Sequence, residues 1–128
     1  MSQRIRYTLI GLGNIGRNLL DVLVHRQQQV LADYGLEFVL VGAADSSGAA
    51  FDPAGLDAAT VRDLKLAGRG VASIAGAGHP GMSALALVKA VDADVLVDAA
   101  PTNLRDGEPG LGCTRYALSA GQHVVAAN

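Results

Sequence analysis

The chain has 128 residues and a mass of 13.0 kDa, a length that fits one domain or a part of a larger protein. Half of its residues are hydrophobic and 17% are charged, which argues against intrinsic disorder. A net charge of −2 offers no attraction to nucleic acid or to an anionic membrane surface. The single cysteine, Cys113, excludes an internal disulfide and a cysteine-based zinc cluster and favours the reducing cytoplasm.

Membrane insertion is not expected from the sequence. The longest apolar runs, such as residues 38–44, stop well short of the ~20 residues that a spanning helix needs. Near the N-terminus, Gly11 and Gly13 interrupt the apolar run before it reaches the length found in a signal peptide.

Strand and helix patterns alternate along the chain. Short apolar runs predict strands at residues 7–11, 38–44, 95–99 and 123–127. Amphipathic spacing predicts helices at residues 14–34, 57–67, 83–91 and 110–120. Ser83 has the residue type of an N-cap, and Gly35 and Gly121 stand where helices commonly end. The glycine-rich stretch 67–81 is interpreted as a surface loop.

This order predicts an α/β fold of the Rossmann type over residues 1–128, with a mainly parallel sheet and helices on both faces. Right-handed crossovers place the loops that follow the strands at the carboxyl edge of the sheet, where ligands bind in such folds. The sequence stops directly after a predicted strand at this edge. We therefore expect the chain to be a fragment of a longer protein.

The segment Gly11-Leu12-Gly13-Asn14-Ile15-Gly16 is a GxGxxG motif that follows a predicted strand and opens a predicted helix. In a dinucleotide-binding turn, the first glycine permits the tight bend, the second lets a pyrophosphate approach the backbone, and the third lets helix and strand pack closely. N–H groups at the helix N-terminus then face the phosphates. The alternative is a plain glycine-rich turn in a chain that contains 16 glycines.

Asp45 ends the second predicted strand, where an acidic residue can bind both hydroxyls of an adenosine ribose. It lies 29 residues after Gly16, further than the usual ~20, and the long first helix can absorb the difference. Its carboxylate would repel a 2′-phosphate, so the sequence favours NAD over NADP. Ser46 and Ser47 weaken this preference, because their hydroxyl and N–H groups can hold a phosphate. A helix cap or an Asx-turn is the alternative role for Asp45.

The segment Asp98-Ala99-Ala100-Pro101-Thr102-Asn103 follows the third strand at the same edge of the sheet. Polar groups there would face the nicotinamide end of a cofactor that enters over the glycine turn. An equally good interpretation is that Pro101 and Asn103 merely shape a turn.

The remaining chemistry-bearing residues offer no catalytic or metal site. The three histidines lack metal-ligand spacing, and no general acid–base pair stands out. Cys113 is expected to be a buried small hydrophobe. Lys65 and Lys89, the two lysines, fall on predicted helix surfaces.

Taken together, these motifs resemble the N-terminal part of homoserine dehydrogenase. The resemblance extends over nearly the whole chain and rests on the glycine motif, on residues 44–48, on the tail 120–128, and most specifically on residues 94–110. In the family a lysine normally comes after the residue that corresponds to Asn128. Where this chain has Ala100, the family often has threonine.

The resemblance implies NAD(P)-dependent interconversion of L-homoserine and L-aspartate 4-semialdehyde, a step of threonine and methionine biosynthesis. It implies that the pyrophosphate lies along Gly13, Asn14 and Ile15, that Asp45 binds the adenosine ribose, and that the nicotinamide lies along the segment Ala100, Pro101, Thr102 and Asn103. It also implies a separate domain, absent from this chain, that binds the amino-acid substrate and forms most contacts of a homodimer. The fragment alone would then bind the nicotinamide dinucleotide without turnover.

Two other functions stay open at this point. The first is a stand-alone dinucleotide-binding module that senses redox state or regulates a partner without catalysis. The second is a related dehydrogenase or reductase that acts on another aspartate-derived substrate.

Overall fold

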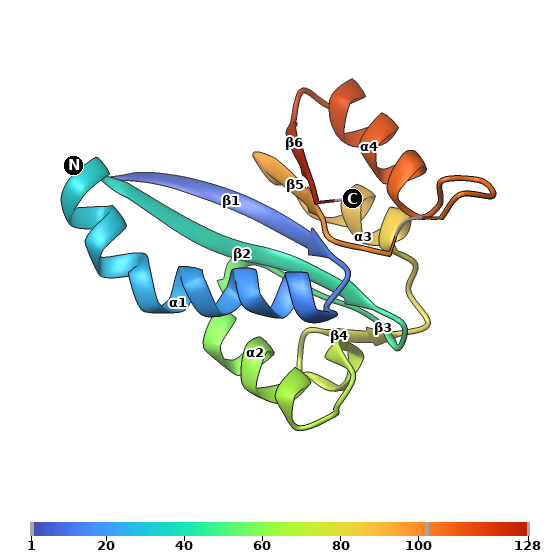
Figure 1. Ribbon diagram of the computed structural model, residues 1–128, viewed down its shortest axis with the longest axis horizontal. Coiled ribbons are helices and arrows are strands. Elements are labelled where there is room, and N and C mark those ends of the chain that lie inside the picture. Colours follow the sequence, from blue (N-terminus) through green and yellow to red (C-terminus); the bar gives the residue numbers. More distant parts are fainter. Residues whose placement is uncertain (1, 102, 128) are drawn as a thin grey trace.

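A six-stranded sheet with the strand order β4-β3-β2-β1-β5-β6 forms the centre of the computed structural model, which describes residues 2–101 and 103–127 (Figure 1). The elements in chain order are β1 (Gln3–Ile10), α1 (Asn14–Tyr34), β2 (Leu36–Asp45), β3 (Gly48–Leu56), α2 (Ala58–Leu66), the short 3-10 helix η1 (Val71–Ser73), β4 (Gly78–Pro80), α3 (Ala84–Ala90), β5 (Val95–Asp98), α4 (Gly110–Ser119) and β6 (His123–Ala126).

The sheet is mixed, with a parallel majority. Strand β1 pairs in parallel with β2 and with β5, and β5 pairs in parallel with β6. At the other edge, β3 and β4 run antiparallel to their neighbours. The predicted α/β class is therefore confirmed, and the four predicted strands and four predicted helices are present within a few residues of their expected bounds.

The antiparallel edge was not expected from the sequence. Strand β3 contains Gly48, the exposed Pro53 and Gly55, residues that are depleted in strands and typical of turns. Strand β4 lies inside the stretch that we interpreted as a loop, which also contains η1. Strand β3 follows β2 directly and pairs with it, and β4 pairs with β3, so the two strands extend the sheet on the side away from β5.

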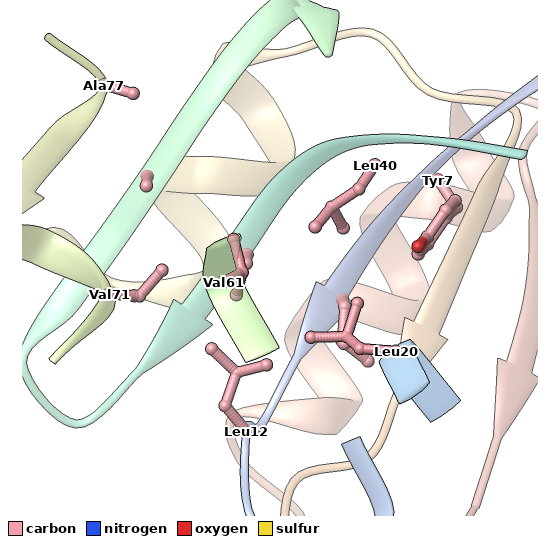
Figure 2. Packing of buried hydrophobic residues seen from close by; sticks show 10 residues of the cluster. Tyr7, Leu12, Leu20, Leu40, Val61, Val71 and Ala77 are labelled. Carbon is pink, nitrogen blue, oxygen red and sulfur yellow. The ribbon is translucent and has the colours of Figure 1, made fainter. Parts of the chain in front are cut away.

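Two hydrophobic clusters cover the two faces of the sheet. Leu40 of β2, Leu20 of α1 and Val61 of α2 belong to the first cluster, seen from close by in Figure 2. Val41 of β2 and Leu87 of α3 belong to the second, together with residues of α4. Neighbouring residues of β2 thus point to opposite faces, as the two-residue period of a strand requires. Helices cover both faces, as predicted.

The helix ends follow local rules that the sequence already carries. Gly35 adopts a left-handed conformation with φ 64°, and its N–H donates to the carbonyl of Leu31, which ends α1. The hydroxyl of Ser83 accepts from the N–H of Ala86 at 3.0 Å and begins α3. Among the described residues, no helix is both long and apolar enough to cross a membrane.

Candidate functional site

The carboxyl ends of β1, β2 and β5 surround a pocket of about 830 Å³, a size typical of small-molecule sites. It lies beside the central strand β1, where neighbouring strands lead into connections on opposite sides of the sheet, as the fold class predicts for a ligand site. Its lining consists of Ile10, Gly11, Leu12, Gly13, Asn14, Ile15, Ala44, Asp45, Ser46, Lys65, Ala84, Ala99, Ala100, Pro101, Pro109 and Ala127.

The glycine turn has the geometry that its motif requires. Gly11 has φ +90°, and a Cβ there would lie 2.6 Å from the carbonyl oxygen of Ala99. A Cβ on Gly16 would overlap the carbonyl oxygen of Gly11, so helix and turn pack too closely for a side chain. Between them, Leu12 points into the first hydrophobic cluster and anchors the turn (Figure 2).

Gly13 differs from the two glycines that flank it. It is exposed, and nothing lies within 4 Å of the position that a Cβ would take. Gly13 therefore leaves open space above the N-terminus of α1, whose first residues, Asn14 and Ile15, also line the pocket. The first turn of α1 contains no acidic residue, so its N–H groups and helix dipole favour an anion there.

The carboxylate of Asp45 lies at the end of β2 and accepts four hydrogen bonds. One oxygen accepts from the N–H and the hydroxyl of Ser47, at 2.8 and 2.5 Å. The other accepts from the Lys65 ammonium and from the N–H of Val71, both at 2.8 Å. The bond to the Ser47 N–H is the Asx-turn that we kept as an alternative, although Asp45 and its neighbour Ser46 also line the pocket.

Two opposing effects set the pKa of Asp45. Burial, the largest single effect, raises the pKa because it removes water from the charged form. The hydrogen bonds from Lys65, Ser47 and Val71 together outweigh burial, so the pKa lies below its ordinary value. Asp45 is therefore ionised at neutral pH, and its negative charge faces a positive partner.

Lys65 is a charged residue of the pocket that the sequence does not identify. Its side chain is 18% exposed, forms an ion pair with Asp45 and lines the pocket. The helical pattern placed it on a solvated surface because nothing in the sequence showed that β3 returns along β2. That hairpin brings α2, which follows β3, close to the end of β2, and a lone lysine in the last turn of a helix is the weak signal that was available.

The segment after β5 forms the opposite side of the pocket. Ala99, Ala100 and Pro101 line it, and the N–H of Ala100 donates to the buried carboxylate of Asp98 at 3.1 Å. Asn103 does not line the pocket. Its side chain bonds to the backbone of the same loop, donating to the carbonyl of Glu108 and accepting from the Arg105 N–H, which is the turn-shaping alternative.

Thr102, the remaining predicted contact of this segment, lies outside the described residues. One pocket is lined by the predicted positions Gly11, Gly13, Asn14, Ile15, Asp45, Ser46, Ala100 and Pro101. Gly16 does not line it and packs against the carbonyl of Gly11.

The other candidate groups lie outside this chemistry. Cys113 is fully buried, and burial together with the charges of Asp98 and Glu108 raises its pKa to about 11, so the thiol stays protonated. Across residues 2–101 and 103–127, no group of three or more histidine, cysteine, aspartate or glutamate side chains is arranged to hold a metal ion.

The fold and the glycine turn define the class of protein: an α/β domain that matches the NAD(P)-binding domains of dehydrogenases. The chain is homologous to homoserine dehydrogenases over their N-terminal NAD(P)-binding region. It is 34% identical over 120 residues to the homoserine dehydrogenase of Methanocaldococcus jannaschii, and 32% identical over 124 residues to the NAD(+)-dependent homoserine dehydrogenase of Pseudomonas canavaninivorans.

These alignments cover 94% and 96% of this chain, which spans 35% of the length of each relative. The solved homoserine dehydrogenase of Thermoplasma acidophilum superposes with a TM-score of 0.80 at 27% identity, over 98% of this chain and 35% of that chain. A hyperthermophilic archaeal homoserine dehydrogenase in complex with NADPH has the same fold, with a TM-score of 0.80 at 21% identity over 98% of this chain and 36% of that chain. No protein-family model matches the chain.

Proposed function

We propose that this chain is the nucleotide-binding domain of a homoserine dehydrogenase, which interconverts L-homoserine and L-aspartate 4-semialdehyde with NAD(P). The observation that carries the proposal is the open space above Gly13, at the N-terminus of α1 and at the carboxyl edge of the sheet. Homology to homoserine dehydrogenases supplies the substrate class. The chain spans 35% of the length of those relatives. We propose that the amino-acid site and the homodimer contacts are formed by the rest of the enzyme.

We propose one orientation for a dinucleotide in this pocket. The pyrophosphate would lie over Gly13 and meet the N–H groups of α1, which a side chain at this position would block. The adenosine ribose would lie at Asp45 and Ser46, at the end of β2. The nicotinamide half would then lie along Ala100 and Pro101, on the other side of β1.

Within the enzyme, the part of this domain is to orient the cofactor. The bound nicotinamide supplies the chemistry, because it accepts or returns the hydride. The apolar wall formed by Ala99, Ala100 and Pro101 would hold one face of the ring and leave the other face toward the substrate. The chain's own residues thus bind and position, and the groups that move the proton of the substrate hydroxyl lie in the remainder.

The preference between NAD and NADP depends on the pair formed by Asp45 and Lys65. We propose that NAD is favoured, since the ionised Asp45 carboxylate repels a 2′-phosphate. The ammonium of Lys65 opposes this effect, because at 2.8 Å it compensates much of the carboxylate charge. The selectivity should accordingly be moderate.

The first test is a calorimetric titration of the chain with NAD+, NADH, NADP+ and NADPH. We expect saturable binding that Gly13→Val abolishes, because the valine side chain would occupy the space of the pyrophosphate. Asn18→Val, at an exposed position of the same helix, is the control and should bind normally. Normal binding by Gly13→Val would show that the glycine turn is not the phosphate site.

Turnover is tested on a protein that joins this domain to the remainder that its relatives possess. We expect NAD(P)H formation that depends on L-homoserine. An intact protein that binds the dinucleotide and is inert toward homoserine would contradict the proposal and favour a non-catalytic sensing module.

A further inference from the structure

Asp98 is a buried polar residue that the proposed cofactor contacts leave unused. It ends β5 and is 4% exposed. One carboxylate oxygen accepts from the N–H of Ala100 at 3.1 Å, two residues further along the chain. The ion pairs among the described residues do not include Asp98. Burial of a carboxylate lowers the stability of the fold unless neighbouring groups compensate its charge. We therefore looked for what this carboxylate contributes.

The second carboxylate oxygen of Asp98 lies against the first residue of α4. A Cβ on Gly110 would overlap this oxygen, so only glycine lets the helix approach the carboxylate so closely. The N-cap of α4, Pro109, has no side-chain hydrogen bond to the helix. In the first turn of α4, the N–H of Leu111 donates to the carbonyl of Gly107 at 2.8 Å, and the N–H of Gly112 donates to the carboxylate of Glu108 at 3.1 Å. The Asp98 carboxylate lies beside Gly110 at this positive end of the helix dipole, which compensates part of its charge.

The backbone bonded to Asp98 belongs to the apolar wall of the pocket. The N–H of Ala99 donates to the carbonyl of Ile10 at 2.8 Å, and the backbone of Ala99 and Ala100 packs against Gly11. On its far side, the same segment is tied to Asp98 through the Ala100 N–H. Ala99 and Ala100 are thus fixed between the glycine turn and the first turn of α4, and both line the pocket at its β5 side.

We propose that Asp98 is a positioning residue that fixes Ala99 and Ala100, in the apolar wall of the pocket, against the first turn of α4 and thereby sets the affinity for the nicotinamide half of the dinucleotide. The inference rests on the proposed function, since it assumes that the nicotinamide lies at this side of the pocket. It assigns the carboxylate a role through the backbone and no contact with the cofactor itself.

The experiment compares NADH with ADP-ribose, which keeps the adenosine, the pyrophosphate and the second ribose and lacks the nicotinamide. Dissociation constants of both ligands are measured for the wild type and for Asp98→Ala. Loss of the hydrogen bond to Ala100 should weaken NADH about tenfold and ADP-ribose less than about twofold. Asp98→Asn retains an oxygen that can accept from the Ala100 N–H, so we expect it to restore the wild-type ratio of the two affinities.

The control is Asp52→Ala. Asp52 forms the same type of bond, its oxygen accepting from the N–H of Ala54 two residues ahead at 2.9 Å, at an exposed position outside the pocket lining. It should leave both affinities unchanged. If Asp98→Ala does not fold, Asp98→Ser replaces it, because a hydroxyl offers the same N–H a weaker acceptor and should give an intermediate loss of NADH affinity.

A structural role alone would predict a different pattern. Equal weakening of NADH and ADP-ribose, or no weakening of either in a folded Asp98 variant, would overturn the positioning role while the proposed function stands. A wild-type chain that binds neither ligand would overturn the proposed function and this inference with it. Thermal unfolding gives a second readout. Asp98→Asn should unfold at a lower temperature, because it removes a negative charge beside the positive end of the α4 dipole, and should still keep the wild-type ratio of the two affinities.

Discussion

Two residues of opposite charge, Asp45 and Lys65, lie at the adenosine side of the pocket, and their charged atoms are 2.8 Å apart. Asp45→Ala removes the carboxylate and leaves the ammonium free to meet a 2′-phosphate, so NADP+ should gain affinity relative to NAD+. Lys65→Ala leaves the carboxylate without its cation, so the same ratio should move the other way. We expect about a tenfold change in each direction, measured by calorimetry with both nucleotides.

Lys89→Ala is the matched control for this pair of variants. Lys89 lies on α3, with its ammonium 5.8 Å from the ring centre of Tyr116, and does not line the pocket. Its removal should leave the ratio of the two affinities unchanged. If Asp45→Ala and Lys65→Ala shifted the ratio in the same direction, the opposition of charges would not be the basis of selectivity.

Asp45 also joins three elements, because its carboxylate bonds to Ser47 in the β2–β3 turn, to Lys65 in α2 and to Val71 in η1. Its pKa is lowered in the folded state, so its contribution to stability is present above the unfolded value of about 3.9 and is lost as the pH falls through the folded pKa. The melting temperature of the wild type should therefore fall more steeply below about pH 4 than that of Asp45→Asn.

The comparison reports on Asp45 alone, because the two proteins differ at this residue and share all other acidic residues. Melting temperatures of both proteins are measured by circular dichroism from pH 7 downward, and the two values should become equal in acid. A constant difference in melting temperature between the two proteins at all pH values would show that the ionised carboxylate of Asp45 does not stabilise the joined elements.

At the level of elements, the sequence predicted what local chemistry determines. The glycine turn, the left-handed Gly35 and the Ser83 cap follow from conformational freedom and capping, which depend on neighbours in the chain. Strand β3 could not be predicted in this way, because Pro53 and Gly55 disfavour a strand and the pairing with β2 is a tertiary contact. Without β3, the sequence could not place Lys65 in the site either, because the β2–β3 hairpin positions α2, which carries Lys65.

In the segment after β5, too, local features were predictable and tertiary contacts were not. The sequence left open whether Pro101 and Asn103 contact a cofactor or shape a turn, and the structure separates them: Pro101 lines the pocket, and Asn103 bonds within its own loop. The sequence places Asp98 at the end of a strand, at the same edge of the sheet as the predicted cofactor contacts. Its contact with α4 could not be foreseen, because it depends on how Gly110 packs against β5.

On the scale of the whole molecule, one ligand would connect the two halves of the sheet, because the pocket is lined by residues of β2 and α2 on one side of β1 and by Ala99, Ala100, Pro101 and Pro109 on the other. A ligand that binds the folded state stabilises it by RT ln(1 + [L]/Kd), which is about 2.7 kcal/mol at a hundredfold excess over Kd. For a domain of this size we expect NADH to raise the melting temperature by roughly 5–15 °C.

Hydrogen exchange should show whether the ligand contacts the whole pocket. Saturating NADH should slow the exchange of the backbone amides of Gly13, Ser46 and Ala100, which follow the ends of three different strands. Protection confined to Ser46 and its neighbours would show that the ligand occupies the adenosine side alone, and would contradict the extended orientation that we propose.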